Sequence, residues 1–164
     1  MLNENDLLGK PIVAYDSGKK IGSVARLIFD YGQRQLVAFV VNRKSYTLQI
    51  LPWSGVREVN IRGVTTHSAQ MIVAASDIFE VKRLLNLQSV TPGMCLQTPD
   101  QQNLGVITCT YFDKETGNIT GYEVIREGSS TRYFVPVQPL LRIKDQIAIM
   151  GKTSRSPRPA TIRV

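Results

Sequence analysis

Short runs of apolar residues, some continuous and some alternating with polar residues, recur along this chain and are typical of β-strands. Examples are the runs Ile12–Tyr15, Leu36–Val41 and Ile119–Ile125. The segments between such runs are rich in Gly, Asp, Asn and Ser, the residues that favour turns. The pattern therefore predicts a mainly β protein built from short strands and hairpins.

One segment near the middle of the chain has a helical period instead. Ile78, Val81, Leu84 and Leu85 lie on one face of a helix that would start at Ser76, a residue suited to the N-cap. Acidic residues occur early in this segment and basic residues late, as the helix dipole favours. We expect a short helix here with a single apolar stripe.

The second half of the pattern repeats the first about 83 residues later. The matching segments, in order, are Ile21–Val24 with Leu104–Ile107, Ile28–Asp30 with Tyr111–Asp113, Gln35–Phe39 with Asn118–Tyr122, and Leu51–Pro52 with Val135–Pro136. The repeat predicts two copies of one small β unit. It also places the last strand of each copy at residues 71–73 and 147–149, and it leaves the stretch from Val59 to Ser68 as an addition to the first copy.

The shared positions have local structural meanings. Gly22 and Gly105 interrupt predicted strands, which indicates a bulge, a bend or the close approach of another backbone. Asp30 and Asp113 open turns, where an aspartate can accept hydrogen bonds from backbone amides. Both features suit a small barrel with sharp corners.

This order of glycines, turns and prolines resembles the PRC-barrel family. The residues that carry the resemblance are Leu8-Gly9, Ile21-Gly22, Phe29-Asp30, Leu36–Val41 and Leu51-Pro52 in the first copy, and Pro92-Gly93, Leu104-Gly105, Phe112-Asp113, Gly117, Ile119–Val124 and Val135-Pro136 in the second. The family includes the cytoplasmic part of the photosynthetic reaction-centre H subunit and the C-terminal half of a bacterial ribosome-maturation factor. The resemblance implies a barrel that docks onto a larger assembly without catalysing a reaction.

Pattern and resemblance together predict an organisation in four parts. Residues 1–75 would form the first PRC-type barrel, residues 76–88 a linker helix, residues 89–151 the second barrel, and residues 152–164 a disordered basic tail. The fold class is thus mainly β, with two small barrels in tandem joined by a short helix.

The net charge of +7 is concentrated in two of these parts. Residues 1–75 hold nine Lys or Arg against five Asp or Glu, and the last thirteen residues hold four basic residues and no acid. The predicted second barrel is close to neutral, with five basic and six acidic residues. Either basic part could face an anionic partner such as RNA or acidic lipid headgroups.

The sequence offers little for catalysis or for binding a cofactor. Cys95 and Cys109 lack the spacing of a zinc site, and both read as reduced, buried small hydrophobes. His67 is the single histidine, and no metal-ligating residue or base accompanies it in the sequence. The glycines occur singly, without the spacing of a nucleotide-binding loop. We therefore expect no enzyme, no cofactor and no metal.

The candidate partner-binding residues are one aromatic residue and basic residues of the predicted loops and tail: Trp53, Lys19, Lys20, Arg34, Arg43, Lys44, Arg155 and Arg158. Trp53 follows Pro52 directly, where it would either pack against the core or anchor an interface. The basic residues would either track an anionic surface or simply keep the chain in solution.

The leading functional hypothesis is a bacterial adaptor that docks onto a larger protein assembly, with photosynthetic or other membrane-associated complex assembly as its setting. The alternative is a ribosome- or RNA-associated maturation factor that uses the basic first barrel and tail. The polar start of the sequence and the lack of a run of ~20 apolar residues predict a cytoplasmic protein, with attachment to the cytoplasmic face of a membrane left open. A homo-oligomer is also left open.

Overall fold

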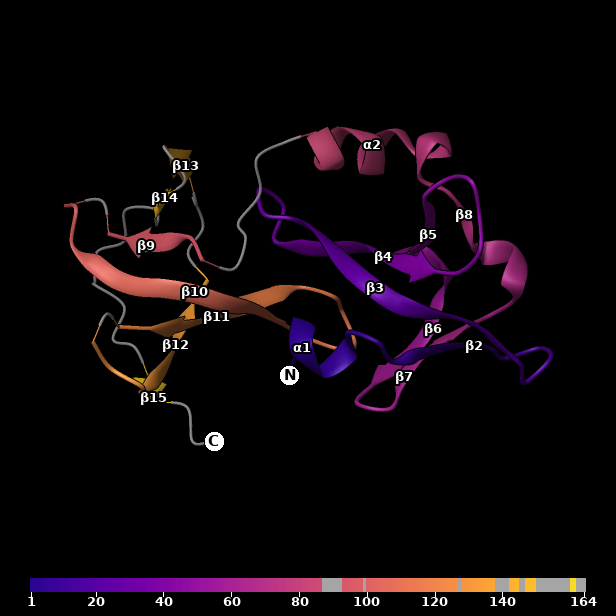
Figure 1. Cartoon of the computed structure of the whole chain (residues 1–164), viewed down its shortest axis with the longest axis horizontal. Coiled ribbons are helices and arrows are strands. Elements are labelled where there is room, and N and C mark those ends of the chain that lie inside the picture. The colour runs from indigo at the N-terminus through magenta and orange to yellow at the C-terminus, as the bar shows by residue number, and fades with distance from the viewer. Residues whose placement is uncertain are drawn as a thin grey trace.

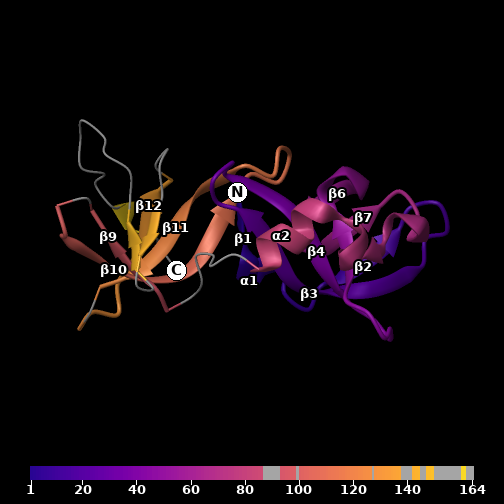
Figure 2. The ribbon, with the colours of Figure 1, turned by 90° about the horizontal axis from the view of Figure 1, so that it is seen from above.

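The protein is mainly β, as a computed structural model shows (Figure 1). The structure describes residues 1–86, 93–98, 100–126 and 128–137, together with the backbone of three further strands at 142–144, 147–149 and 160–161. Its strands form two sheets that lie side by side along the long axis of the molecule (Figures 1 and 2). No helix in the described part of the chain has the length and apolar character needed to cross a bilayer.

The first sheet has seven strands in the order β6-β7-β2-β3-β4-β5-β8. Their bounds are β2 Pro11–Ala14, β3 Lys20–Asp30, β4 Gln35–Asn42, β5 Gln49–Pro52, β6 Val56–Asn60, β7 Gly63–Thr66 and β8 Val73–Ala74. Short 3-10 turns connect the later strands: η1 Trp53–Gly55, η2 Ala69–Met71 and η3 Ala75–Asp77. All neighbouring strands are antiparallel except β2 and β7, which are parallel.

The second sheet repeats this order as β13-β14-β9-β10-β11-β12-β15. Its bounds are β9 Cys95–Gln97, β10 Asn103–Phe112, β11 Ile119–Ile125, β12 Arg132–Pro136, β13 Arg142–Lys144, β14 Ile147–Ile149 and β15 Ala160–Thr161. Its one parallel pair, β9 with β14, corresponds to β2 with β7. The duplication predicted from the sequence is therefore present in the strand order.

One predicted equivalence is wrong. Strand β7 is the counterpart of β14, because each pairs in parallel with the short strand that precedes the longest strand of its sheet, β2 and β9 respectively. Residues 63–66 therefore belong to the repeated unit, whereas the sequence reading treated them as an addition and assigned this place to residues 71–73. That segment instead ends a 3-10 turn and begins β8, the counterpart of β15.

Neither sheet closes into a barrel through its strand pairing. In each described sheet the path ends at two strands that do not pair with one another, β6 and β8 in the first and β13 and β15 in the second. The closed barrels predicted from the sequence are thus not seen in the described strands. Each sheet is open, with two edge strands that do not pair with each other. Strand β15 also shows that residues 160–161 of the predicted disordered tail pair with β12.

The glycines Gly22 and Gly105 mark close backbone approaches, as predicted. A Cβ atom on Gly22 would lie 2.6 Å from Cγ1 of Val41, and one on Gly105 would lie 2.6 Å from the carbonyl oxygen of Ile125. The register shifts next to both glycines, as expected at a bulge. Only a residue without a side chain lets the second and third strands of each unit, β3 with β4 and β10 with β11, approach this closely.

The two halves meet at equivalent hairpins. The contacts are reciprocal: each contact from the first half to the second has a matching contact from the second half to the first. The amide of Leu36 donates to the carbonyl of Gly117 (2.8 Å), and the amide of Ile119 donates to the carbonyl of Arg34 (2.9 Å). Leu36 matches Ile119 in the repeat, and Arg34 matches Gly117. The rings of another matched pair, Phe29 and Phe112, lie 6.1 Å apart between their centroids. This is the geometry of a two-fold dimer interface, built within one chain.

The first residues of the chain contribute to the second sheet. Strand β1 (Leu2–Asn3) pairs with the end of β10. Helix α1 (Glu4–Leu7) follows, and its start is held by a capping box between Asn3 and Asp6. The Glu4 carboxylate accepts a hydrogen bond from the amide of Thr110 (3.1 Å). The N-terminal segment thus ties the first half to the second.

The main core runs across this junction. Its buried side chains come from both halves and include Leu7, Ile12, Leu36, Phe39, Leu51, Leu96, Ile107, Phe112 and Val124. A second, smaller cluster lies on the other face of the first sheet, where helix α2 (Phe79–Asn86) covers it (Figure 1). Because both faces of β4 are covered, its sequence is an almost uninterrupted apolar run.

Helix α2 has the predicted stripe but not the predicted start. Val81 and Leu84 are buried against the first sheet, and Ile78 and Leu85 pack beside them. Ser76 lies in η3 rather than at the N-cap of α2, because Ile78 has extended backbone angles that interrupt the helix. Residues 87–92 lie outside the described residues, so the end of the predicted linker at residue 88 is not tested.

We predict that Gly117→Ala destabilises the protein more than Gly128→Ala. Both glycines have a φ of +74°, which costs a residue with a side chain about 1–2 kcal/mol. A Cβ on Gly128 would meet nothing within 4 Å, whereas one on Gly117 would lie 2.9 Å from Cε2 of Trp53 and would also meet the Gln35 amide. This crowding at the junction should add about 1–3 kcal/mol to the loss of stability in Gly117→Ala. Urea unfolding of the two variants measures the difference, and equal losses would contradict the described junction.

We predict that ionisation of Glu4 lowers the stability of the protein as the pH rises. Burial raises the pKa of this carboxyl above its ordinary value of 4.5, although the hydrogen bond from Thr110 opposes the shift. The folded state therefore keeps the proton to a higher pH than the unfolded state, and stability falls as the pH rises above about 4.5. Glu4→Gln should raise the free energy of unfolding at pH 8 more than at pH 4. Glu58→Gln, at an exposed glutamate, is the control; an equal effect of Glu4→Gln at both pH values would refute the prediction.

Candidate functional site

Trp53 lies at the junction of the two halves. It opens η1 directly after β5, and its ring centroid lies 6.4 Å from that of the buried Phe39. The other side of the indole lies against Gly117 of the second half. The residue is half-buried and packs against the main core, so the core-packing interpretation of the sequence is correct for one part of the ring.

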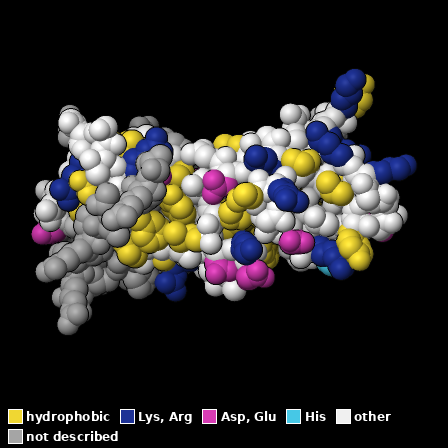
Figure 3. Space-filling view, turned by 90° about the horizontal axis from the view of Figure 1, so that it is seen from below, with side chains coloured by type: hydrophobic (Ala, Val, Ile, Leu, Met, Phe, Trp, Pro, Cys, Tyr) yellow, Lys and Arg dark blue, Asp and Glu magenta, His cyan; other side chains and the backbone are white. Residues whose placement is uncertain are grey.

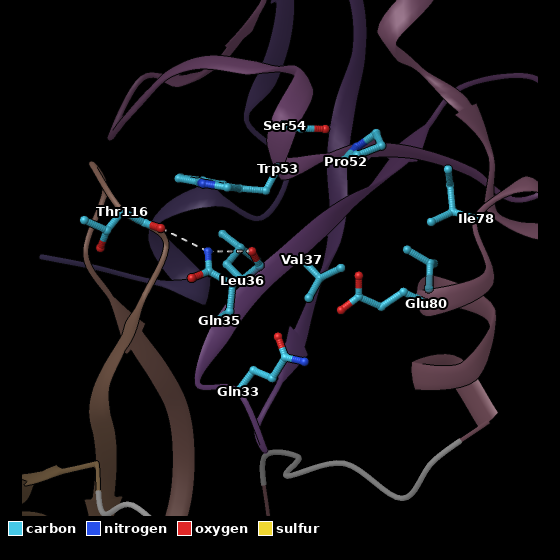
Figure 4. A pocket seen from close by; sticks show the side chains of 11 residues that line it. Gln33, Gln35, Leu36, Val37, Pro52, Trp53, Ser54, Ile78, Glu80 and Thr116 are labelled. Carbon is cyan, nitrogen blue, oxygen red and sulfur yellow. Dashed lines mark hydrogen bonds between the residues drawn. The ribbon is translucent and has the colours of Figure 1, made fainter.

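A groove of about 560 Å³ opens beside this indole (Figure 4). Strand β4, η1, helix α2 and the hairpin turn of the second half each contribute to it. Its apolar lining consists of Leu36, Val37, Pro52, Trp53, Ile78 and Val81, and its polar lining of Gln33, Gln35, Ser54, Glu80 and Thr116. The groove exists because the second half and α2 both dock onto the first half.

Two polar groups of the groove differ in how they are held. The Gln35 amide is fixed, since its nitrogen donates to the carbonyl of Leu36 (3.1 Å) and to that of Thr116 (3.0 Å). Figure 4 shows the Glu80 carboxylate extending from α2 toward the strand that carries Val37. Glu80 is exposed, and neither of the ion pairs within the described residues involves it. It is therefore free to accept hydrogen bonds from a bound group.

Four of the predicted cations gather at the end of the first half that lies away from the second. Lys19 and Lys20 stand at the start of β3, and Arg43 and Lys44 follow β4. The close approach at Gly22 brings these two segments together, because a Cβ on that glycine would lie 3.8 Å from Cβ of Arg43. We call these four exposed residues the basic end. Figure 3 shows Lys and Arg side chains over this part of the surface, with hydrophobic side chains between them.

The other predicted residues do not join the basic end. Arg34 lies in the turn after β3 with a φ of 57°, and its carbonyl takes part in the contact between the halves. Arg155 and Arg158 lie outside the described residues. The eight predicted residues are therefore divided among the groove, the junction, the basic end and an undescribed segment.

The paired aspartates form turns, as predicted. Asp30 accepts a hydrogen bond from the amide of Gln33 (3.0 Å), and Asp113 accepts from those of Glu115 (2.8 Å) and Thr116 (3.0 Å). These bonds to the charged form lower the pKa of Asp113. Asp30 also forms an ion pair with Arg83 of α2 at 3.4 Å, which the sequence did not suggest.

The thiols differ in their surroundings. Cys109 is buried, and burial raises the pKa of its thiol to about 12. Cys95 is half-buried, and both thiols are free. Cys109 thus fits the prediction of a small buried hydrophobe, and Cys95 fits it only in part.

Sequence reasoning missed the groove and two exposed apolar side chains next to the basic end. Gln33, Gln35 and Glu80 come together only through tertiary packing, and no local pattern marks them. Tyr46 and Leu48 are exposed in the loop between β4 and β5.

The family model described as the PRC-barrel domain matches residues 2–70. No curated protein matches the chain. The matched range covers β1 to η2, and so contains nearly the whole first sheet. Residues 2–70 are therefore identified as a PRC-barrel domain.

Proposed function

We propose that the protein is a non-enzymatic adaptor, built from two PRC-type barrel units in tandem, that docks onto a larger protein assembly. The proposed setting is the assembly of a membrane-associated complex in a bacterium, with photosynthetic complexes included, at the cytoplasmic face of the membrane. A PRC-barrel domain at residues 2–70 suits a binding role in general terms. The docking role in this proposal rests on the groove beside Trp53.

The groove suits a segment of another protein. Its apolar floor and the half-buried indole offer burial to one or two apolar side chains. The fixed Gln35 amide and the free Glu80 carboxylate would orient the segment, the carboxylate by accepting from a Lys, an Arg or a free backbone amide. Glu80 is the only titratable side chain among the described residues that line the groove, a composition better suited to binding than to acid–base chemistry.

The alternative function is that of a ribosome- or RNA-associated factor. The observation that favours it is the gathering of Lys19, Lys20, Arg43 and Lys44 at one end, since clustered cations can neutralise phosphates. The basic residues of the tail would add a separate contact with the phosphates. Such binding should weaken steeply as salt is raised, whereas binding in the groove should depend much less on salt.

Affinity purification of the full chain from membrane and ribosomal fractions, run side by side, tests the proposal. We expect a defined protein complex from the membrane fraction, and we expect a variant with Gln33→Ala and Glu80→Lys to lose most of it. Both positions are exposed, so the variant should fold. Glu58→Lys makes the same charge change at an exposed site on β6, outside the groove lining, and should retain the complex.

Two results would overturn the adaptor proposal. One is recovery of the same proteins by the groove variant and the native chain. The other is enrichment of ribosomal particles that is lost at moderate salt and on neutralising the basic end, which would establish the alternative.

A further inference from the structure

We propose that the basic end of the first half docks onto the surface of an anionic lipid bilayer, with Tyr46 and Leu48 entering the headgroup region. This inference deepens the membrane setting proposed above. It stands on different residues from the groove, so the two can fail separately.

The loop between β4 and β5 presents its apolar side chains to solvent. Tyr46 is fully exposed (109%), and Leu48 is 48% exposed. The loop projects from the body of the first half (Figure 2). The Ser45 hydroxyl accepts a hydrogen bond from the amide of Thr47 (3.3 Å), so the bend that carries Tyr46 is held locally. Tyr46 and Leu48 therefore extend from an ordered turn.

Basic residues lie in the same loop as these apolar side chains and in the loop beside it. Arg43 and Lys44 precede Tyr46 in the same loop, and Lys19 and Lys20 belong to the adjacent segment. Asp16 is the one acidic residue in the two loops. Each Lys or Arg near an anionic bilayer strengthens binding about fivefold, equivalent to ~1 kcal/mol. Four cations against one acid favour a negatively charged surface.

An exposed aliphatic side chain beside the basic residues favours a lipid surface over a nucleic acid as the partner. A tyrosine can stack on a base or lie at a membrane interface, where its ring and hydroxyl suit the two environments. Leu48 has no comparable contact with RNA, whereas the boundary of the acyl chains buries it. Apolar residues of peripheral proteins enter this boundary while Lys and Arg remain at the headgroups. A projecting loop reaches it without any rearrangement of the sheet.

Flotation of the full chain with vesicles tests the proposal. We expect binding to vesicles that contain phosphatidylglycerol, little binding to pure phosphatidylcholine, and weaker binding as salt is raised. The double variant Tyr46→Ser with Leu48→Ser should bind about tenfold more weakly or worse, because the burial of both side chains is lost. Both positions are exposed, so the variant should fold.

The turn between β6 and β7 supplies a matched control. Ile61 is 65% exposed and lies beside the exposed Arg62, so it repeats the combination of an apolar and a basic residue elsewhere on the first half. Ile61→Ser should leave vesicle binding unchanged. Tyr46→Trp gives a direct signal: its emission should shift to shorter wavelength with anionic vesicles, measured against the native chain, in which Trp53 is the single tryptophan.

Three results would overturn the proposal. They are no binding to anionic vesicles at low salt, equal binding by the Tyr46 and Leu48 double variant, or tight binding to single-stranded RNA in place of vesicles. None of them bears on the groove, because neither Tyr46 nor Leu48 belongs to its lining. Loss of the groove's protein partner with vesicle binding intact would in turn refute the adaptor proposal alone.

Discussion

The reciprocal contact between two equivalent hairpins is the constraint on which the rest of this structure depends. Two backbone hydrogen bonds, between Leu36 and Gly117 and between Ile119 and Arg34, fix the halves in one register. The junction continues into a shared core, so neither half buries its apolar surface alone. This agrees with the small size of each unit, which is near the lower limit for an independent domain. The groove beside Trp53 is a product of the same contact, since the turn that carries Gly117 forms one of its walls.

Strand period and repeat predicted much of the fold, because both are local properties of the sequence. The apolar run of β4, the turns at Asp30 and Asp113 and the close approaches at Gly22 and Gly105 are all where the pattern places them. The predictions failed where pairing between distant segments decides the outcome. Strand β7 was not recognised as part of the repeated unit, because its role is set by its parallel partner β2 rather than by its own residues. Closure of a sheet into a barrel likewise depends on whether its two edge strands pair with each other.

The candidate sites were only partly predictable for a related reason. Charge is visible in a sequence, so the basic end could be anticipated, yet Arg34 carries the same charge and lies in the turn at the junction. The two halves have also diverged where their outer faces differ. Val40 lies under α2 in the first sheet, while its counterpart Glu123 bonds to Thr108 and Arg132 in the second. Such differences give one half an apolar face for a helix and the other a polar one.

The pairing of β1 with β10 has a consequence for how the chain matures. Leu2 and Asn3 are translated more than a hundred residues before their partners Phe112 and Tyr111. Strand β1 must therefore wait until β10 has emerged from the ribosome, and a nascent chain arrested before Tyr111 would leave β1 without a strand to join. Contacts of such long sequence separation slow the search for the native state. Strand β1 is thus synthesised long before it can pair.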